Sequence, residues 1–121
     1  MTTDPITRED LEMAAKAAGL VVVGEADKMV AQPGRRHEGG LVVKNEFGGD
    51  SLWHPGEDDG DCARMEDAVG IDVCRFRRLV RVCVSGQGIV DADFADHDND
   101  RSRARRYASV KLAAAVGRGM A

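Results

Sequence analysis

The chain has 121 residues and a formal net charge of −4 at pH 7, and its length fits one domain but not two. The negative charge disfavours nonspecific contact with phosphates, so duplex nucleic acid is not an expected partner. No apolar run approaches the roughly 18 residues of a membrane span, no signal peptide is evident, and the three cysteines lack a C-x-x-C pair, so we expect a protein of a reducing cytoplasm.

The first helix is expected to begin after Thr7, which suits the N-cap position. Asp10 stands at the third helical position and completes a short-armed capping box. Gly19 supplies the residue that follows the helix. The face expected to be buried consists of Leu11, Ala14, Ala15 and Ala18. This narrow alanine stripe indicates close packing on a sheet.

Runs of β-branched residues predict strands at 20–24 and 41–45, with a weaker candidate at 28–32. Residues 33–40 are expected to form the loop between them. Residues 47–60 contain four glycines and a proline, so we expect an irregular surface loop there.

A second, short helix is expected to begin near Asp58 and to end at Gly70. Asp58 or Asp59 can cap this helix, because carboxylates are favourable at the positive end of the helix dipole. The apolar stripe of the helix consists of Cys62, Met65 and Val69.

Two further strands, 71–76 and 79–84, are predicted to be joined near Arg77-Arg78, with residues 87–90 as a third. Val80, Val82 and Val84 should share one face of the second strand. The aspartate-rich stretch up to Asp100 is expected to be a loop. A final helix at 101–117 is expected to bury Ala104, Tyr107, Ala108, Leu112 and Ala115. Together these elements predict a single α+β domain, with a small antiparallel, meander-type sheet of four to five strands packed by about three helices.

The sequence carries no familiar catalytic motif: it has no G-x-S-x-G, no Walker loop and no G-x-G-x-x-G after a strand. The three histidines lie far apart, and the predicted positions of the cysteines favour buried thiols over nucleophiles. An EF-hand register that begins at Asp96 fails, because Arg101 stands where glycine is required and Tyr107 where glutamate is required. We therefore expect the aspartates to pair within the chain with Arg101 and Arg105, and Asp100 to cap the final helix.

The segment 51–65, Ser-Leu-Trp-His-Pro-Gly-Glu-Asp-Asp-Gly-Asp-Cys-Ala-Arg-Met, concentrates special residues more than any other. One interpretation is structural, with Trp53 closing the core and Asp58 capping a helix. The other is functional, with carboxylates and Arg64 beside an aromatic wall. The candidate site residues are Trp53, His54, Asp58, Asp59, Asp61, Arg64 and Arg105.

This segment resembles the W-N-P-x-x-D-D-G-D-A-x-R-L motif of small uncharacterised proteins of temperate bacteriophages and prophages. Residues 7–19, 68–73 and 105–120 are also similar to that family, so the resemblance touches about half of the chain. The chain departs from the motif at His54, where the pattern has Asn, and at Cys62, where it has Ala. The resemblance implies a phage origin, an accessory role and the cytoplasm of a bacterial host, without a reaction.

The leading hypothesis is non-catalytic binding to a host protein or a small ligand. One alternative is an anti-defence protein that sequesters a nucleotide immune signal, with Trp53 stacking on a base and with Arg64 and the arginines of the final helix contacting phosphates. Another is a metal-dependent hydrolase that uses the cluster Asp58, Asp59 and Asp61 with His54. No cofactor is expected, and a short, valine-rich sheet leaves open a homodimer.

Overall fold

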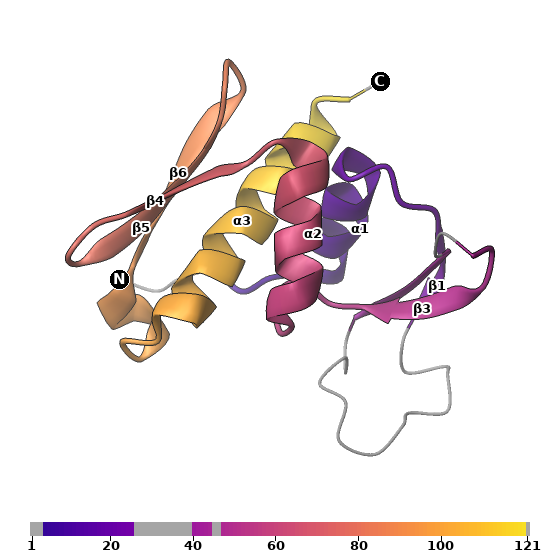
Figure 1. Ribbon diagram of the computed structural model, residues 1–121, viewed down its shortest axis with the longest axis horizontal. Helices are drawn as coiled ribbons and strands as arrows, with labels where there is room; N and C mark the ends of the chain where they lie inside the picture. Colours follow the sequence, from indigo (N-terminus) through magenta and orange to yellow (C-terminus); the bar gives the residue numbers. More distant parts are fainter. Residues whose placement is uncertain (1–3, 26–39, 45–46, 121) are drawn as a thin grey trace.

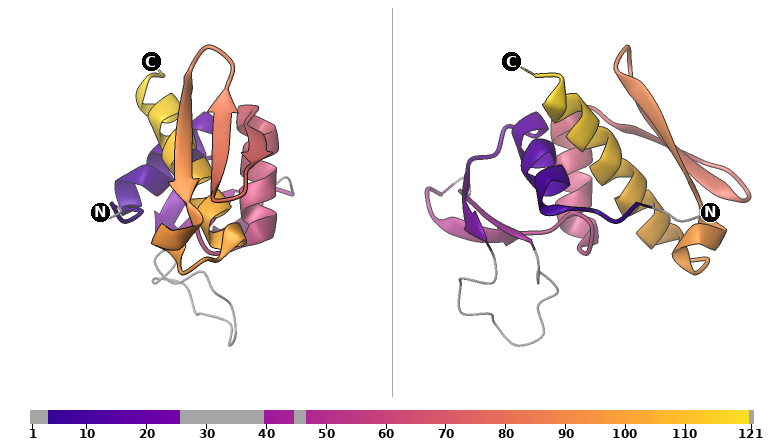
Figure 2. Two further views of the ribbon diagram at one scale, coloured as in Figure 1. Left: turned by 90° about the vertical axis from the view of Figure 1, so that its left-hand side faces the viewer. Right: turned by 180° about the vertical axis from the view of Figure 1, so that it is seen from behind.

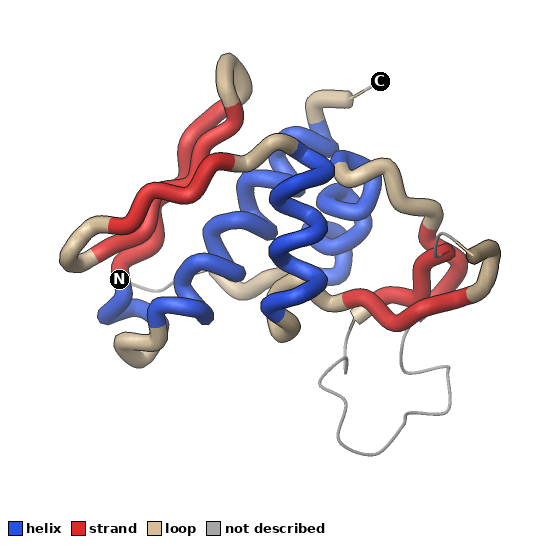
Figure 3. The backbone as a smooth tube through the Cα atoms, in the orientation of Figure 1, coloured by secondary structure: helices blue, strands red, loops and turns tan. Residues whose placement is uncertain are grey.

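Helix α3 (Arg101–Arg118) is the element around which the rest of the fold is arranged in the computed structural model, which describes residues 4–25, 40–44 and 47–120 (Figure 1). Within these residues the fold is a single α+β domain of three α-helices and six strands in two three-stranded antiparallel sheets. The other elements are α1 (Arg8–Ala17), β1 (Val22–Glu25), β2 (Leu41–Lys44), β3 (Asp50–Trp53), α2 (Asp59–Val69), β4 (Asp72–Arg75), β5 (Leu79–Val84), β6 (Gly88–Asp93) and the 3₁₀-helix η2 (Phe94–His97). The helices lie between sheet A (β1–β3) and sheet B (β4–β6), as Figures 2 and 3 show.

Helix α1 begins with the predicted capping box. The Thr7 N–H donates to Asp10 Oδ2 at 3.0 Å, and the Asp10 N–H donates to Thr7 Oγ1 at 3.1 Å. Of the predicted face, Leu11, Ala14 and Ala15 are buried and Ala18 is partly buried, but the prediction that the face packs on a sheet is wrong, because α1 packs closely on α3. A Cβ at Gly117 of α3 would lie 2.0 Å from the backbone oxygen of Met13. Small residues on both helices allow this close approach. The alanine pattern of α1 alone is compatible with packing on a helix or on a sheet, so it could not predict which of the two covers this face.

A buried ionic cluster joins the same two helices. The Asp10 side chain is only 5% exposed, and its carboxylate accepts from Lys111 Nζ and from Arg118 Nη2, both at 2.7 Å. Burial alone would raise the pKa of Asp10, but the hydrogen bonds from Lys111, the Thr7 N–H and Arg118 outweigh it and hold this pKa well below its usual value. The ionised carboxylate therefore stabilises the contact between α1 and α3.

Sheet A contains a strand that the glycine-rich composition concealed. Strand β3 pairs with β2 in the register Leu41↔Trp53, so the prediction of an irregular loop over all of 47–60 is wrong. Pairing with β2 and burial of Trp53 in the core outweigh the turn signals of the flanking glycines. The strand predicted at 20–24 is shifted to Val22–Glu25, and the strand predicted at 41–45 is present as Leu41–Lys44. The candidate at 28–32 lies outside the described residues.

Sheet B packs one face on α3. Val80, Val82 and Val84 are buried on that face, as predicted. Strand β6 continues to Asp93 and leads directly into η2, so the prediction of a loop throughout the aspartate-rich stretch is wrong. Outward aspartates alternate there with inward residues such as Ala92, which is the pattern of a strand with one solvated face.

The predicted single sheet of four to five strands is also wrong, since the helices separate two meanders of three strands each (Figure 3). Helix α3 is covered by α1, by α2 and by sheet B, so it buries more of its surface than the predicted stripe. Ser109, Val110, Ala113 and Ala114 are buried as well, whereas Tyr107 is half-buried and Ala115 is exposed. Among the described residues, no helix combines the length and apolarity needed to cross a membrane.

We expect Asp10→Asn to lower the free energy of unfolding by about 2 kcal/mol, because Lys111 and Arg118 lose their buried anionic partner. Urea unfolding followed by circular dichroism measures this difference. Glu12→Gln, which removes only the exposed pair with Arg8, is the matched control and should change the free energy by less than about 0.5 kcal/mol.

The pKa of Asp10 is lowered on folding, so its contribution is complete above the ordinary value of 3.8 and is lost as the pH falls below it. The difference between wild type and Asp10→Asn should therefore be smaller at about pH 3 than at about pH 7. An equal difference at both values would contradict this account.

Candidate functional site

The segment 51–65 folds as the junction between β3 and α2. Trp53 ends β3 and is only 4% exposed, with its ring in the hydrophobic core beside Leu41, Cys62 and Met65 among others. This is the structural one of the two interpretations for Trp53. The ring forms no aromatic wall on the surface.

The turn after Trp53 is closed by backbone hydrogen bonds. The His54 carbonyl accepts from the N–H groups of Glu57 at 3.0 Å and Asp58 at 2.9 Å. The His54 N–H in turn donates to Asp61 Oδ2 at 3.0 Å, across the turn. Glycine is required at position 56, because a Cβ there would lie 2.9 Å from His54 Cε1. The Pro-Gly pair of the motif thus serves a tight, buried turn.

The three aspartates of the motif have different partners. Asp58 caps α2, as predicted, and its Oδ1 accepts from the Asp61 N–H at 2.8 Å. Asp61 is buried and pairs with Arg64 Nη2 at 2.6 Å, while the more exposed Asp59 pairs with Arg106 Nη1 at 2.7 Å. Across the described residues, no group of three His, Cys, Asp or Glu side chains is placed to hold a metal ion.

Two arginines of α3 attach α2 to that helix. Arg106, only 13% exposed, donates from Nε to the Gly56 carbonyl at 3.1 Å in addition to its pair with Asp59. Arg105 forms a two-point ion pair with the buried carboxylate of Glu66, which also accepts from Ser109 Oγ at 2.6 Å. This ion pair with Glu66 raises the pKa of Arg105. Of the candidate site residues, Arg105 therefore lies on the α2–α3 contact, away from the turn.

Sequence reasoning missed Arg106 and Glu66. Adjacent arginines on a helix point in different directions, and here each contacts a different part of α2. Glu66 lies one turn after Cys62 on the buried side of α2, but its partner is 39 residues away along the chain. No local signal could have identified that pair.

The acidic run behaves as predicted only in part. Asp100 caps α3 by accepting from the Arg103 N–H at 3.1 Å, which confirms the capping prediction. Asp98 pairs with Arg103 at 2.9 Å, but Arg105 pairs with Glu66, so the predicted pairing of Arg105 with this run is wrong. Arg101 lies over the ring of Phe94, with its Cζ 5.2 Å from the ring centroid.

The cysteines differ in environment. Cys62 is fully buried, and burial together with the nearby Glu66 charge raises the pKa of its thiol to about 12. This environment is unsuited to a thiolate nucleophile. The expectation that all three thiols are buried is wrong, since Cys74 is exposed and Cys83 is half-buried on the outer face of sheet B.

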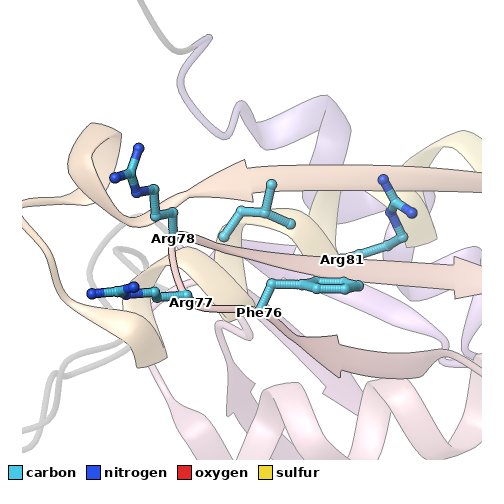
Figure 4. Close-up of a pocket in the computed structure, with 5 residues that line it drawn as sticks. Phe76, Arg77, Arg78 and Arg81 are labelled. Carbon is cyan, nitrogen blue, oxygen red and sulfur yellow. The ribbon is translucent and has the colours of Figure 1, made fainter.

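A surface hollow lies at the tip of the β4–β5 hairpin, which follows α2 along the chain. It is lined by Phe76, Arg77, Arg78, Leu79 and Arg81 and has a volume of about 380 Å³ (Figure 4). Arg81 lies over the Phe76 ring, 5.6 Å from its centroid. In the sequence, Arg77-Arg78 is predicted only to connect two strands. The exposed aromatic residue among four arginines of 75–81 was the available signal.

We expect Arg106→Ala to lower the free energy of unfolding by about 1–3 kcal/mol, because it removes a charged donor from the buried Gly56 carbonyl and a partner from Asp59. Arg103→Ala, which loses only an exposed ion pair on the same helix, is the control and should cost less than about 0.5 kcal/mol. Urea unfolding monitored by the fluorescence of Trp53 measures both. Equal effects would show that Arg106 does not hold the turn.

Thiol labelling tests the environment of Cys62. In the double variant Cys74→Ser/Cys83→Ser, Cys62 is the remaining thiol, and we expect no labelling by an aromatic disulfide reagent until the protein is unfolded. In wild type, Cys74 should react in the folded state. Rapid labelling of Cys62 in the folded double variant would show an accessible, ionised thiol instead.

Comparisons with protein-family models, with curated proteins and with solved structures find no match to this chain. The placement of the residues described above is therefore what a functional proposal has to build on.

Proposed function

We propose that this chain is a non-catalytic binding protein of a bacteriophage or prophage, which works in the host cytoplasm by docking on a host protein through the outer face of sheet B. The phage assignment is supported by the resemblance of segment 51–65 and its flanking regions to small phage proteins. The binding surface is supported by the exposure of apolar side chains on this sheet.

The side chains of the motif mainly stabilise the fold and do not form a binding surface. Trp53 lies in the core, Asp58 caps α2, and Asp61 is bound across the turn. A ligand that bound any of these three side chains would have to break the contact that the side chain makes within the fold. A binding surface is therefore better sought where large apolar groups face solvent.

The observation that carries the proposal is the outer face of sheet B, which is the face turned away from α3. Ile89 is 63% exposed there and pairs across the strands with half-buried Cys83, while Phe76 is 50% exposed at the hairpin tip. Leu79 contributes further half-buried apolar surface. The Arg81–Asp91 ion pair lies between these two apolar groups on the same face. Large exposed apolar side chains on a sheet face are typical of a protein interaction surface.

The two alternatives obtain less support from the geometry. A nucleotide site at the motif would need Trp53 to stack on a base, but Trp53 is buried. Of the arginines expected to contact phosphates, Arg64 is paired with Asp61 and Arg105 is bound to Glu66. A hydrolase would need Asp58, Asp59 and Asp61 to converge, and their hydrogen bonds and ion pairs run to different partners.

We expect Ile89→Asp to abolish capture of a protein partner from bacterial lysate, because it places a charge at the large apolar side chain that is most exposed on this face. Val21→Asp, on the other side of the molecule and equally exposed at 61%, is the matched control and should retain capture. Affinity capture followed by mass spectrometry compares the two with wild type.

Retention of the same partners by folded Ile89→Asp would contradict the proposal. Sedimentation of the purified proteins checks the other occupant of this face, a second copy of the chain. A dimer that Ile89→Asp converts to a monomer would assign the surface to self-association instead of host binding.

A further inference from the structure

The β4–β5 hairpin concentrates positive charge on an otherwise acidic protein. Residues 75–81 contain four arginines and no acidic residue, whereas the whole chain carries a net charge of −4. All four arginines are exposed. The surplus is therefore local, and it lies at the tip of the β4–β5 hairpin, although Arg75 is opposite Val80 and so lies on the face of sheet B that is turned toward α3.

Within the described part of the chain, three of these arginines have no carboxylate partner. Among the arginines that the structure describes, all except Arg75, Arg77, Arg78 and Arg101 form an ion pair with an acidic side chain of the same chain. Arg101 instead lies over Phe94. The unpaired guanidinium groups are thus gathered on one hairpin, although carboxylates are more numerous than cations in the sequence. An arrangement of this kind is complementary to negative charge on a partner.

The fourth arginine builds one wall of the hollow. Arg81 donates from Nε and Nη2 to the two oxygens of Asp91, at 2.8 and 3.0 Å, and its guanidinium lies over the Phe76 ring. This pair raises the pKa of Arg81 and lowers the pKa of Asp91, as expected for a two-point ion pair. Arg81 is therefore fixed and largely neutralised, and it holds the Phe76 ring in place.

The hollow is apolar within and basic at its rim. The Phe76 ring and the Leu79 side chain lie within it, while the guanidinium groups of Arg77 and Arg78 project from the turn away from that ring (Figure 4). These groups diverge, so they do not surround a single compact anion. They suit an extended segment whose apolar side chain enters the hollow while its flanking carboxylates reach the rim.

We propose that the β4–β5 hairpin binds an acidic peptide segment of the partner protein, with an aliphatic or aromatic side chain of that segment seated against Phe76 and Leu79. This inference rests on the proposed function, since it names the chemistry of the partner at the same sheet. Arg77 and Arg78 supply the charge recognition, and the apolar hollow supplies the anchor site.

Single-stranded nucleic acid fits these observations less well. Successive bases need several aromatic rings on one surface, and Phe76 is the aromatic side chain that this hollow offers, with Arg81 already over its ring. Asp91 and Asp93 on the neighbouring strand would also repel a phosphate backbone. An acidic peptide places fewer charges against these aspartates.

Selection from a random peptide library tests the inference with the full-length protein. We expect wild type to enrich peptides in which Asp or Glu flanks an aliphatic or aromatic residue. Arg77→Glu/Arg78→Glu should bind the enriched peptides roughly tenfold more weakly or worse, because the attraction becomes repulsion. Arg8→Glu/Lys16→Glu on α1 makes the same change in net charge and should bind them as wild type does.

A single-stranded oligothymidylate is measured in parallel by fluorescence anisotropy. Tighter binding of this probe than of the peptides, lost in Arg77→Glu/Arg78→Glu, would overturn the inference in favour of nucleic acid. Enrichment of peptides without acidic residues would overturn it as well. If Ile89→Asp abolishes capture of the partner and Arg77→Glu/Arg78→Glu does not, the proposed function holds while this inference fails.

Discussion

The fold depends on two buried carboxylates that meet the cationic side chains of α3. Asp10 of α1 binds Lys111 and Arg118, and Glu66 of α2 binds Arg105 and Ser109. A desolvated carboxylate is costly unless its charge is paired and its oxygens accept hydrogen bonds, so each helix has one favoured position against α3. These pairs therefore fix orientation, while the small residues between the helices supply the close packing.

This arrangement determines which surfaces remain for contact. The polar side chains of α3 contact α1 and α2, and the remaining buried side of the helix packs on the valines of sheet B. Sheet B thus has one face in the core and one in solvent, where Phe76, Ile89 and the arginine-rich hairpin lie. Segment 51–65, which has the densest set of unusual residues, forms the junction between β3 and α2. The proposed recognition surface consists of residues that belong to no recognised sequence motif.

Local signals were sufficient for the helices. Thr7 with Asp10, Asp58 with Gly70, and Asp100 each mark a helix end through contacts within a few residues, so their patterns could be recognised in advance. Strand β3, the split into two sheets and the Arg105–Glu66 pair depend on partners distant in the chain. The same limit applies to the candidate site. Whether Trp53 lies in the core or on the surface, and whether Arg77 has a carboxylate nearby, is decided by tertiary packing.

The proposed acidic partner is compatible with the negative net charge of the protein, because the charge is unevenly distributed. Most acidic side chains of the described region that lie near α3 are paired with its arginines and lysine or cap a helix, which leaves the hairpin arginines as a separate basic surface. At physiological ionic strength, charges farther apart than about 8 Å are largely screened, so the net charge of the whole chain matters less than the local surplus at contact. Repulsion by the negative net charge of the protein lowers the rate of encounter with any polyanion. The proposed hairpin site would bind tightly only a ligand that also fills the apolar hollow. The proposed partner, a mixed acidic and apolar segment, would therefore be favoured over nonspecific phosphate polymers.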